Sequence, residues 1–319
     1  MSMSEFDLIQ RFFTRPTPNA LLGVGDDAAL LQVSAGNVLA VSTDMLVSGT
    51  HFLPDADPFL LGHKTLAVNL SDMAAMGAAP RWATLAIALP EADEAWLAQF
   101  SAGFFALAQR YGVELIGGDT TRGPLSLCVT IFGEVPAQQT LRRNGAQIGD
   151  EIWVSGNLGS AALALAHLQK RIILSNAEFA VCAPALHQPQ PRVALGLALR
   201  GTANSAIDIS DGLLADLGHI LDASHTGAEI GFADLPISGT LHSLSSGDLM
   251  QQCILSGGDD YELCFTAPVA RHGEVLRIAA QLDLPLKRIG KIVAGNGCIV
   301  HDAAGNPLDI EACGYDHFR

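Results

Sequence analysis

Basic residues are scarce in this sequence. The 319 residues include 18 Lys and Arg against 33 Asp and Glu, which gives a formal net charge of −15. Nucleic-acid-binding domains usually carry a basic surface, and anionic membranes attract basic segments, so this charge argues against both partners. No apolar run approaches the roughly 18 residues of a spanning helix, and the start of the chain lacks the apolar region and cleavage site of a secretory signal. We therefore expect a cytoplasmic protein that binds neither nucleic acid nor membrane.

Common catalytic and metal-binding signatures are also missing. The six cysteines form no C-x-x-C pair, and most lie in apolar segments, where cysteine behaves as a small hydrophobic residue. The sequence has no Walker A motif, no kinase H-R-D set and no G-x-S-x-G elbow. If the protein handles nucleotide phosphates, acidic residues with metal ions must replace much of what a P-loop does with backbone amides and lysine.

Apolar residues make up 49% of the chain, enough for a large core. At about 150 residues per domain, the length favours two domains, which we place at 1–137 and 138–319, with the polar stretch 136–150 as the linker. Alternating helical and strand periods indicate an α/β or α+β class. We expect helices over 4–14, 57–77, 93–111, 160–169 and 212–223. We expect strands over 37–43, 81–89, 113–116, 125–135, 151–155, 206–209, 261–266, 289–293 and 298–301.

Aspartates recur where apolar runs end beside small residues. The segments are GVGDDAALL (Asp26, Asp27), VSTDM (Asp44), NLSDMAAMG (Asp72), IGGDTT (Asp119) and IDISDG (Asp208, Asp211). Carboxylates beside buried strands are unfavourable unless they are paired, hydrogen-bonded or bound to metal. Few Lys or Arg are nearby, and oxygen ligands favour Mg²⁺, Mn²⁺ or Ca²⁺ over zinc. The pattern therefore predicts a site for hard divalent cations.

Each aspartate also has a simpler interpretation. Asp211 precedes a helical pattern and could be its N-cap, Asp26 and Asp27 could cap a turn, and Asp72 could lie on a solvated helix face. Asp119 is the hardest to explain in this way, because the two glycines before it allow the backbone to approach a ligand closely. Single segments leave both interpretations open, whereas five together favour the metal site.

One segment matches the dinucleotide-binding fingerprint G-x-G-x-x-G/A, at Gly23, Gly25 and Ala28, with Asp44 near the position of the ribose-binding acid. Only the nine residues AALLQVSAG, counted from Ala28, precede the next expected strand, too few for the crossover helix of a βαβ unit. Asp26 and Asp27 would also point negative charge at a pyrophosphate. We therefore reject nicotinamide binding.

Longer motifs carry a resemblance to a known family. GVGDDAAL, STDMLVSGTHF, KTLAVNLSDMAAMGAAPRW, LIGGDTTRGPL, SAIDISDGLLADLGHI, LSGGDDYELCFT and the terminal GYDHF are similar, in order, to segments of the thiamine-monophosphate kinase family. The resemblance runs from about residue 5 to the end. It implies a two-domain α+β fold of the aminoimidazole-ribonucleotide-synthetase type, with an N-terminal sheet that completes a barrel across a homodimer and a C-terminal α/β domain. The N-terminal domain would bind ATP and Mg²⁺ and form the dimer.

The resemblance also implies a reaction: ATP phosphorylates thiamine monophosphate to thiamine diphosphate, the final step of thiamine diphosphate biosynthesis, with several Mg²⁺ ions and no general base. Implied metal positions are Asp27, Ser42, Thr43, Asp44, Asp72, Asp119, Asp208 and Asp211. Implied ATP contacts are Gly118, Asp119, Arg143 and Ser210, and implied substrate contacts are His51, Asp259 and Ala312.

Two of these positions depart from the family pattern: Asp259 stands where the family usually has Glu, and Ala312 stands where it often has Trp before GYDHF. Either Tyr315 or Phe318 would then have to supply the aromatic contact, or the substrate would be held more loosely. Taken alone, His51 would be an exposed loop histidine and Arg143 a solvated linker charge. The alternatives are a purine-pathway cyclo-ligase, a selenophosphate synthetase, which would need a cysteine earlier than Cys128, and a non-catalytic nucleotide-binding module.

Overall fold

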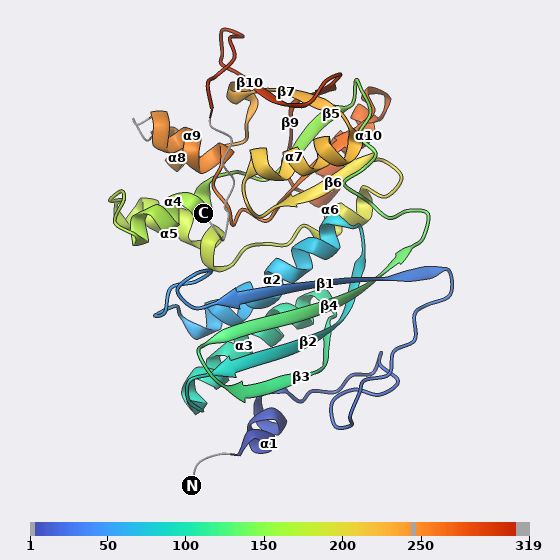
Figure 1. Ribbon diagram of the computed structural model, residues 1–319, viewed down its shortest axis with the longest axis vertical. Coiled ribbons are helices and arrows are strands. Elements are labelled where there is room, and N and C mark those ends of the chain that lie inside the picture. The colour runs from blue at the N-terminus through green and yellow to red at the C-terminus, as the bar shows by residue number, and fades with distance from the viewer. Residues whose placement is uncertain (1–3, 244–246, 311–319) are drawn as a thin grey trace. The chain divides into compact units, whose positions relative to one another are not determined.

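The computed structural model describes residues 4–243 and 247–310, and the chain divides into two compact units (Figure 1). Unit 1 comprises Met1–Met73 and Ala78–Gln138, and unit 2 comprises Ala74–Gly77 and Gln139–Arg319. The four residues 74–77 are separated in sequence from the rest of unit 2. Hydrogen bonds connect them to it, from the N–H of Leu141 to the carbonyl of Met76 (3.1 Å) and from Arg200 Nε to the carbonyl of Gly77 (2.6 Å).

Unit 1 is a four-stranded sheet with helices on one face. Its strands are β1 (Asn37–Val47), β2 (Ala79–Leu89), β3 (Glu114–Arg122) and β4 (Ser126–Pro136), in the order β1-β4-β2-β3. Only β2 and β3 are parallel, and α3 (Glu94–Tyr111) connects them. The helices α2 (Pro58–Ala75) and α3 lie behind the sheet in Figure 1, and α1 (Glu5–Leu8) continues into a π-helix, Ile9–Phe13.

The alternation of side chains along β4 explains why one face is covered. Leu127, Val129 and Ile131 are fully buried, and they alternate with partly exposed residues, as expected for a sheet with one packed face. On β1, Val41 and Met45 are 55% and 57% exposed. The face of the sheet opposite the helices therefore presents apolar side chains that nothing in the described part of unit 1 covers.

Unit 2 contains a six-stranded sheet of order β10-β7-β9-β5-β8-β6. Its strands are β5 (Glu151–Ser155), β6 (Ser205–Ile209), β7 (Gly227–Gly231), β8 (Glu262–Ala267), β9 (Leu286–Val293) and β10 (Gly297–His301). Its helices are α4 (Ser160–Leu168), α5 (Asn176–His187), α6 (Val193–Ala198), α7 (Leu213–Ser224), α8 (Gly239–Ser243), α9 (Gly247–Leu255) and α10 (His272–Leu282). The short helices Phe232–Asp234 and Val269–Arg271 are 3₁₀.

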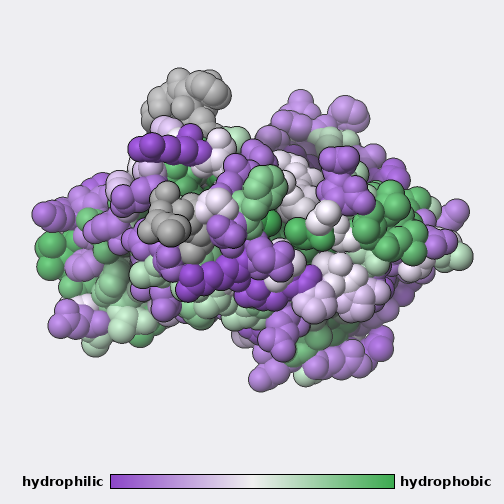
Figure 2. All heavy atoms as spheres, turned by 90° about the horizontal axis from the view of Figure 1, so that it is seen from below, coloured by the Kyte–Doolittle hydropathy of each residue, from purple (hydrophilic) through white to green (hydrophobic). Residues whose placement is uncertain are grey.

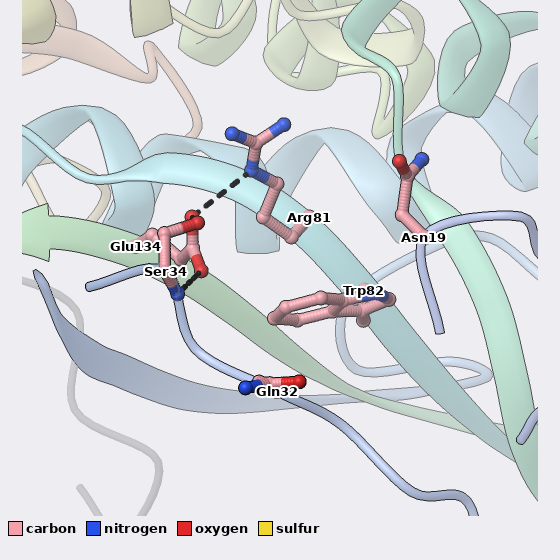
Figure 3. A pocket seen from close by; sticks show the side chains of 6 residues that line it. All are labelled: Asn19, Gln32, Ser34, Arg81, Trp82 and Glu134. Carbon is pink, nitrogen blue, oxygen red and sulfur yellow. Dashed lines mark hydrogen bonds and ion pairs between the residues drawn. The ribbon is translucent and has the colours of Figure 1, made fainter. Parts of the chain in front are cut away.

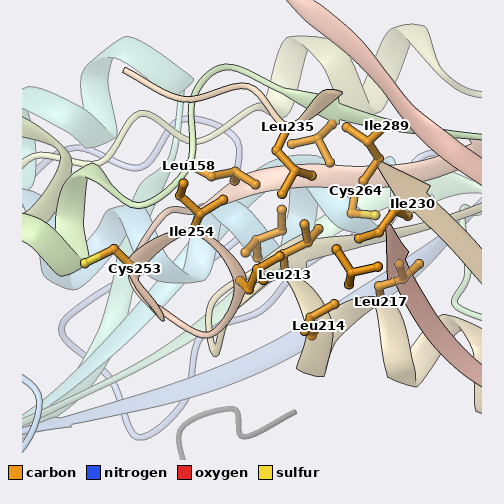
Figure 4. Close-up of a cluster of buried hydrophobic side chains, with 14 of the residues drawn as sticks. Leu158, Leu213, Leu214, Leu217, Ile230, Leu235, Cys253, Ile254, Cys264 and Ile289 are labelled. Carbon is orange, nitrogen blue, oxygen red and sulfur yellow. The ribbon is translucent and has the colours of Figure 1, made fainter. Parts of the chain in front are cut away.

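The core of unit 2 forms between the sheet and its helices. Figure 4 shows leucines 213, 214 and 217 of α7 beside Ile230, Ile289 and Cys264 of the sheet. Every residue of β5, β6 and β8 is buried. These strands have no solvent-facing side, so they appear in the sequence as short apolar runs rather than as alternating patterns.

All five expected helices and all nine expected strands are present; β5 has the expected bounds, and the others differ at one or both ends. The largest difference is at β3: the expected strand ended at residue 116, but the strand continues through Gly117, Gly118 and Asp119 to Arg122 because it pairs with β2 along its whole length. The prediction missed α5, α6, α8, α9, α10 and β7. Within the expected helix 4–14, residues Ile9–Phe13 form a π-helix. Residues 23–30 form only isolated bridges and no helix, which agrees with rejecting the dinucleotide fingerprint.

Hydrophilic side chains cover most of the face in Figure 2, with patches of apolar side chains between them. Among residues 4–243 and 247–310, no helix is both long enough and apolar enough to span a bilayer.

Candidate functional site

In unit 1, two hydrogen bonds connect β1 with α2, one between side chains and one from the backbone of β1 to a side chain of α2. Ser42 Oγ donates a hydrogen bond to Asp72 Oδ2 (2.5 Å), and the N–H of Asp44 donates to Asn69 Oδ1 (3.2 Å). Alternate residues of a strand share a face, and helix residues three apart share a side. Ser42 and Asp44 therefore face the side of α2 that carries Asn69 and Asp72. Asp72 thus lies against the sheet and not on a solvated helix face.

Thr43 lies on the other face of β1. Its hydroxyl is 2.9 Å from that of Thr130, its partner on β4. The strand alternation thus separates the three neighbouring residues expected to bind metal: Ser42 and Asp44 face α2, and Thr43 lies on the uncovered face.

Asp119 and Gly118 lie exposed in β3, next to β2. Gly118 has φ +152, and a Cβ there would lie 1.8 Å from the carbonyl oxygen of Leu85. Only glycine fits this close strand pairing. The glycine before Asp119 is therefore required by the packing of β3 against β2, independently of any ligand.

Two further expected residues lie in loops of unit 1. Asp27 is exposed, and its N–H donates to Asp26 Oδ1 (2.8 Å), so the Asp26 carboxylate accepts a hydrogen bond within this turn. His51 follows β1, half-buried, and its Nδ1 accepts the N–H of Val47 (3.0 Å). A ring nitrogen that accepts a hydrogen bond carries no proton, so the neutral His51 ring has its proton on Nε2.

Unit 1 also contains a small cavity of about 150 Å³, lined by Asn19, Gln32, Ser34, Arg81, Trp82 and Glu134 (Figure 3). Glu134 is 3% exposed and accepts hydrogen bonds from the N–H (2.6 Å) and hydroxyl (2.9 Å) of Ser34, with Arg81 Nε at 3.4 Å. Burial alone would raise the pKa of Glu134, but these contacts hold it below its usual value. Through these hydrogen bonds with Ser34, Glu134 of β4 connects the segment before β1 to the sheet. No residue expected in the functional site lines this cavity.

In unit 2, the expected residues lie at the end of β6. Asp208 is in the strand and 6% exposed, and Ser210 and Asp211 lie in the loop before α7. The N-cap of α7 is Gly212, with no side-chain capping bond, so the N-cap interpretation of Asp211 is wrong. The Asp211 side chain therefore does not serve to begin the helix.

A carboxylate that the sequence did not single out holds this loop. Asp216, in the first turns of α7, is 3% exposed, and its Oδ2 accepts the N–H groups of Ser210 (3.0 Å), Asp211 (3.0 Å) and Gly212 (3.1 Å). Burial raises the pKa of Asp216 to about 7, with the Asp211 charge adding to the rise and the backbone donors opposing it.

Asp259 lies beside the same loop, with an unusual backbone conformation. Its φ is +69 and that of Tyr261 is +49, which is uncommon for residues other than glycine. The N–H of Asp259 donates to the carbonyl of Ser210 (2.9 Å), and Tyr261 Oη donates to Asp259 Oδ1 (3.1 Å). Asp260 is buried, at 8% exposure, and both of its carboxylate oxygens lie 3.0 Å from the backbone nitrogen of Gly159 before α4. Burial raises the pKa of Asp260 well above its usual value.

Another buried acid, Glu262, begins β8. Arg192 Nε and Nη2 donate to its two oxygens (2.6 and 2.5 Å), and Ser155 Oγ donates to Oε2 (2.5 Å). Sequence reasoning missed this pair because 70 residues separate its charges. Arg143 is exposed, and its carbonyl accepts the Ser224 hydroxyl (3.2 Å). Ala312 lies outside the described residues.

The donor chemistry of these residues fits a hard cation, because it consists of carboxylate and hydroxyl oxygens. Within residues 4–243 and 247–310, however, no three His, Cys, Asp or Glu side chains lie close enough to form a ready-made metal site. Five of the expected acids belong to unit 1 and three to unit 2, namely Asp27, Asp44, Asp72 and Asp119 with the neighbouring Asp26 in the first, and Asp208, Asp211 and Asp259 in the second. The contacts within each group join pairs of residues, such as Ser42 with Asp72.

Comparison with known proteins identifies the architecture. The model of the AIR synthase related protein, N-terminal domain, matches residues 25–135, and that of the AIR synthase related protein, C-terminal domain, matches residues 147–303. The chain therefore has the two-domain α+β fold of AIR synthase related proteins, as predicted.

Close relatives narrow this class to one family. The thiamine-monophosphate kinase of Escherichia coli (strain K12) is 48% identical over 324 residues, covering 100% of this chain and 99% of the relative. The crystal structure of thiamine-monophosphate kinase from Stenotrophomonas maltophilia K279a is 51% identical, with a TM-score of 0.87, covering 97% and 99% of the two chains. A structure of AaThiL complexed with AMPPCP and TMP is 29% identical, with a TM-score of 0.78 and 89% coverage of each chain. The chain belongs to the thiamine-monophosphate kinase family and is therefore an enzyme, a kinase.

Proposed function

We propose that the protein transfers the γ-phosphoryl group of ATP to thiamine monophosphate, forming thiamine diphosphate and ADP, as the final step of thiamine diphosphate biosynthesis in the cytoplasm. The observation that carries this proposal is the 48% identity to the Escherichia coli thiamine-monophosphate kinase over the full chain. The structure of AaThiL with AMPPCP, an ATP analogue, and TMP supports the same pair of substrates.

Binding two anionic substrates to a protein of charge −15 requires cations. We propose Mg²⁺, held in unit 1 by Asp27, Ser42, Thr43, Asp44, Asp72 and Asp119 and in unit 2 by Asp208 and Asp211. Bound Mg²⁺ would neutralise phosphate charge and stabilise the charge that develops on the leaving oxygen. The oxygen-only donor set supports this choice of metal.

The remaining expected residues would bind and orient the substrates. Gly118 offers an approach without a side chain, Ser210 offers a hydroxyl beside the loop of Asp211, and the Arg143 guanidinium suits bidentate pairing with a phosphate. His51 would donate a hydrogen bond from its Nε2–H to the phosphate of thiamine monophosphate, because its Nδ1 already accepts the N–H of Val47. Asp259 and the region of Ala312 would also contact thiamine monophosphate.

The chain needs no general base for this reaction. The acceptor is a phosphate monoester, whose second pKa is about 6, so its attacking oxygen is already largely deprotonated at neutral pH. We therefore propose direct in-line transfer: the acceptor oxygen bonds to the γ-phosphorus as the bond to the β–γ bridging oxygen breaks, and ADP leaves.

The test of function measures ADP formation with ATP and Mg²⁺, with and without thiamine monophosphate, and identifies the product by mass. We expect thiamine diphosphate only when both substrates and Mg²⁺ are present. ATP binding without any diphosphate would refute the proposed acceptor. ADP release without acceptor, with labelled phosphate left on the protein, would instead reveal a phosphoenzyme and refute direct transfer.

We also propose that the protein is a homodimer in which the uncovered sheet face of unit 1 completes a barrel with that of a second copy. The apolar exposure of Val41 (55%) and Met45 (57%) on this face supports the proposal, because such patches mark interaction surfaces. Light scattering should give twice the chain mass. Val41→Lys should reduce it to one chain mass, and Val269→Lys should not, since Val269 is equally exposed (61%) but lies in unit 2. A dimer unchanged by Val41→Lys would place the interface elsewhere.

A further inference from the structure

Asp216 stands out among the buried acids of unit 2. In the described part of the chain no Lys, Arg or His forms an ion pair with it, although its side chain is 3% exposed. A buried carboxylate without a counter-ion is unfavourable unless hydrogen bonds satisfy it. Its Oδ2 receives three N–H groups at 3.0–3.1 Å. Those three donors are therefore what keeps this carboxylate in place.

Helix capping accounts for only one of these three contacts. An acid of the first turn can accept the N–H of the N-cap residue, as in a capping box, and the N-cap of α7 is Gly212. The other two donors to Asp216 are the N–H groups of Ser210 and Asp211, which precede the N-cap. The Asp216 carboxylate thus extends beyond the start of α7. Three consecutive backbone N–H groups of the preceding loop donate to its Oδ2.

The loop held in this way is packed on its other side too. The carbonyl of Ser210 accepts the N–H of Asp259 (2.9 Å), and that of Ile209 accepts the N–H of Tyr261 (2.8 Å). Gly212 has φ +116, and a Cβ there would lie 2.7 Å from the carbonyl carbon of Ser256. The backbone of residues 209–212 is therefore fixed between Asp216 and the segment of Asp259.

We propose that Asp216 is a positioning residue for phosphoryl transfer: it holds the loop 210–212 so that Ser210 and Asp211 keep the geometry for nucleotide and Mg²⁺ binding, and through Ser210 it orients Asp259. This inference rests on the proposed function of those three residues. Asp216 itself touches neither metal nor substrate. Without its carboxylate, three buried N–H groups lose their acceptor, and the loop must rearrange to satisfy them.

The test compares Asp216→Ala with Asp150→Ala. Asp150 is equally buried, at 3% exposure, and its Oδ2 accepts hydrogen bonds from the Gln147 N–H (2.9 Å) and Asn204 Nδ2 (2.8 Å), neither of which belongs to a proposed site residue. Both variants should lower the melting temperature. Only Asp216→Ala should raise the half-saturating Mg²⁺ concentration, by about tenfold or more, and weaken Mg²⁺-dependent AMPPCP binding measured by calorimetry. Equal shifts in the two variants, or none in Asp216→Ala, would overturn the proposal.

Asp216→Asn keeps the proposal testable if the alanine variant does not fold. Its amide oxygen can still accept the loop N–H groups, so it should recover most of the Mg²⁺ affinity that Asp216→Ala loses while remaining weaker than the unmodified protein. Loss as large as in Asp216→Ala would contradict a role in accepting backbone hydrogen bonds. The calorimetric measurement needs no turnover, so it tests Asp216 independently of the reaction. An unmodified protein that binds AMPPCP but makes no thiamine diphosphate would refute the proposed function. The comparison of the variants by calorimetry would still decide the role of Asp216.

Discussion

The two units hold their candidate site residues by different means. In unit 1 these residues lie mainly on strands and a helix, and their contacts join side chains, as between Ser42 and Asp72. In unit 2 they lie mainly in loops whose backbone is fixed by buried carboxylates, as between residues 210–212 and Asp216. A side chain on a regular element takes its direction from the element's period. A side chain on a loop depends on tertiary contacts, so unit 2 should be the more sensitive to changes away from the site.

We expect the largest loss of unfolding free energy when the buried ion pair of unit 2 is broken. Arg192→Met leaves the carboxylate of Glu262, 5% exposed, without its cation, and such a loss costs about 3–5 kcal/mol of unfolding free energy. The exposed pair of Arg11 and Glu94 in unit 1 (59% and 54% exposed) is the control, and Arg11→Met should cost less than about 1 kcal/mol. Urea unfolding followed by tryptophan fluorescence measures both. If Arg192→Met and Arg11→Met lowered the free energy of unfolding equally, unit 2 would not depend more than unit 1 on its ion pair.

The next effect concerns catalysis in unit 1. Asp119→Asn, and likewise Asp44→Asn, should lower kcat by about 10²–10³-fold, or roughly 3–4 kcal/mol of transition-state stabilisation, because a proposed metal ligand loses its charge. Asp93→Asn is the control in the same unit: Asp93 caps α3 through the N–H groups of Ala95 and Trp96, and Asn caps equally well. Near-normal turnover by Asp119→Asn would remove that residue from the metal site.

A smaller effect compares the two groups of acids through metal binding. Their carboxylates repel one another without cations, so Mg²⁺ should raise the melting temperature by mass action, with a stabilisation of about 2.7 kcal/mol at one hundred times the dissociation constant. Asp44→Asn and Asp211→Asn, one in each unit, should each reduce that rise. Differential scanning fluorimetry over a Mg²⁺ series measures it. A melting temperature indifferent to millimolar Mg²⁺ would contradict the proposed cation sites.

The smallest expected effect depends on pH. The pKa of Glu134 is below its usual value in the folded chain, so its contribution to stability is present above the unfolded value of about 4.3 and is lost as the pH falls through the folded value. Glu134→Gln should therefore cost about 1 kcal/mol at pH 7 and less at pH 3.5. Unfolding in urea at the two pH values measures the difference. A cost independent of pH would show that the Glu134 charge contributes nothing.

The contrast between the units also explains what the sequence could predict. The strand that carries Ser42 was evident from its apolar run, although its expected end at residue 43 left out Asp44, which also lies on β1. The motifs pointed to the family that the relatives confirm. Asp216 was not evident, because GLLADLGHI places it at a position of α7 that looks polar and solvated, and only the packing of the loop shows it buried. Arg192 and Glu262 were missed because their contact spans 70 residues. Local patterns predict elements, whereas buried polar contacts depend on distant parts of the chain.

Residues 74–77, which are the last two residues of α2 and the turn after it, belong to unit 2, and this has a consequence for biosynthesis. Domains generally fold as units, the N-terminal one first, as the chain leaves the ribosome. Residues 74–77 emerge with unit 1, long before Leu141 and Arg200, whose hydrogen bonds they accept. Unit 2 must therefore pack against residues 74–77, which are synthesised before the rest of the unit. A single cut after residue 138 would leave its C-terminal fragment without that piece, so the chain cannot be divided there into two self-sufficient halves.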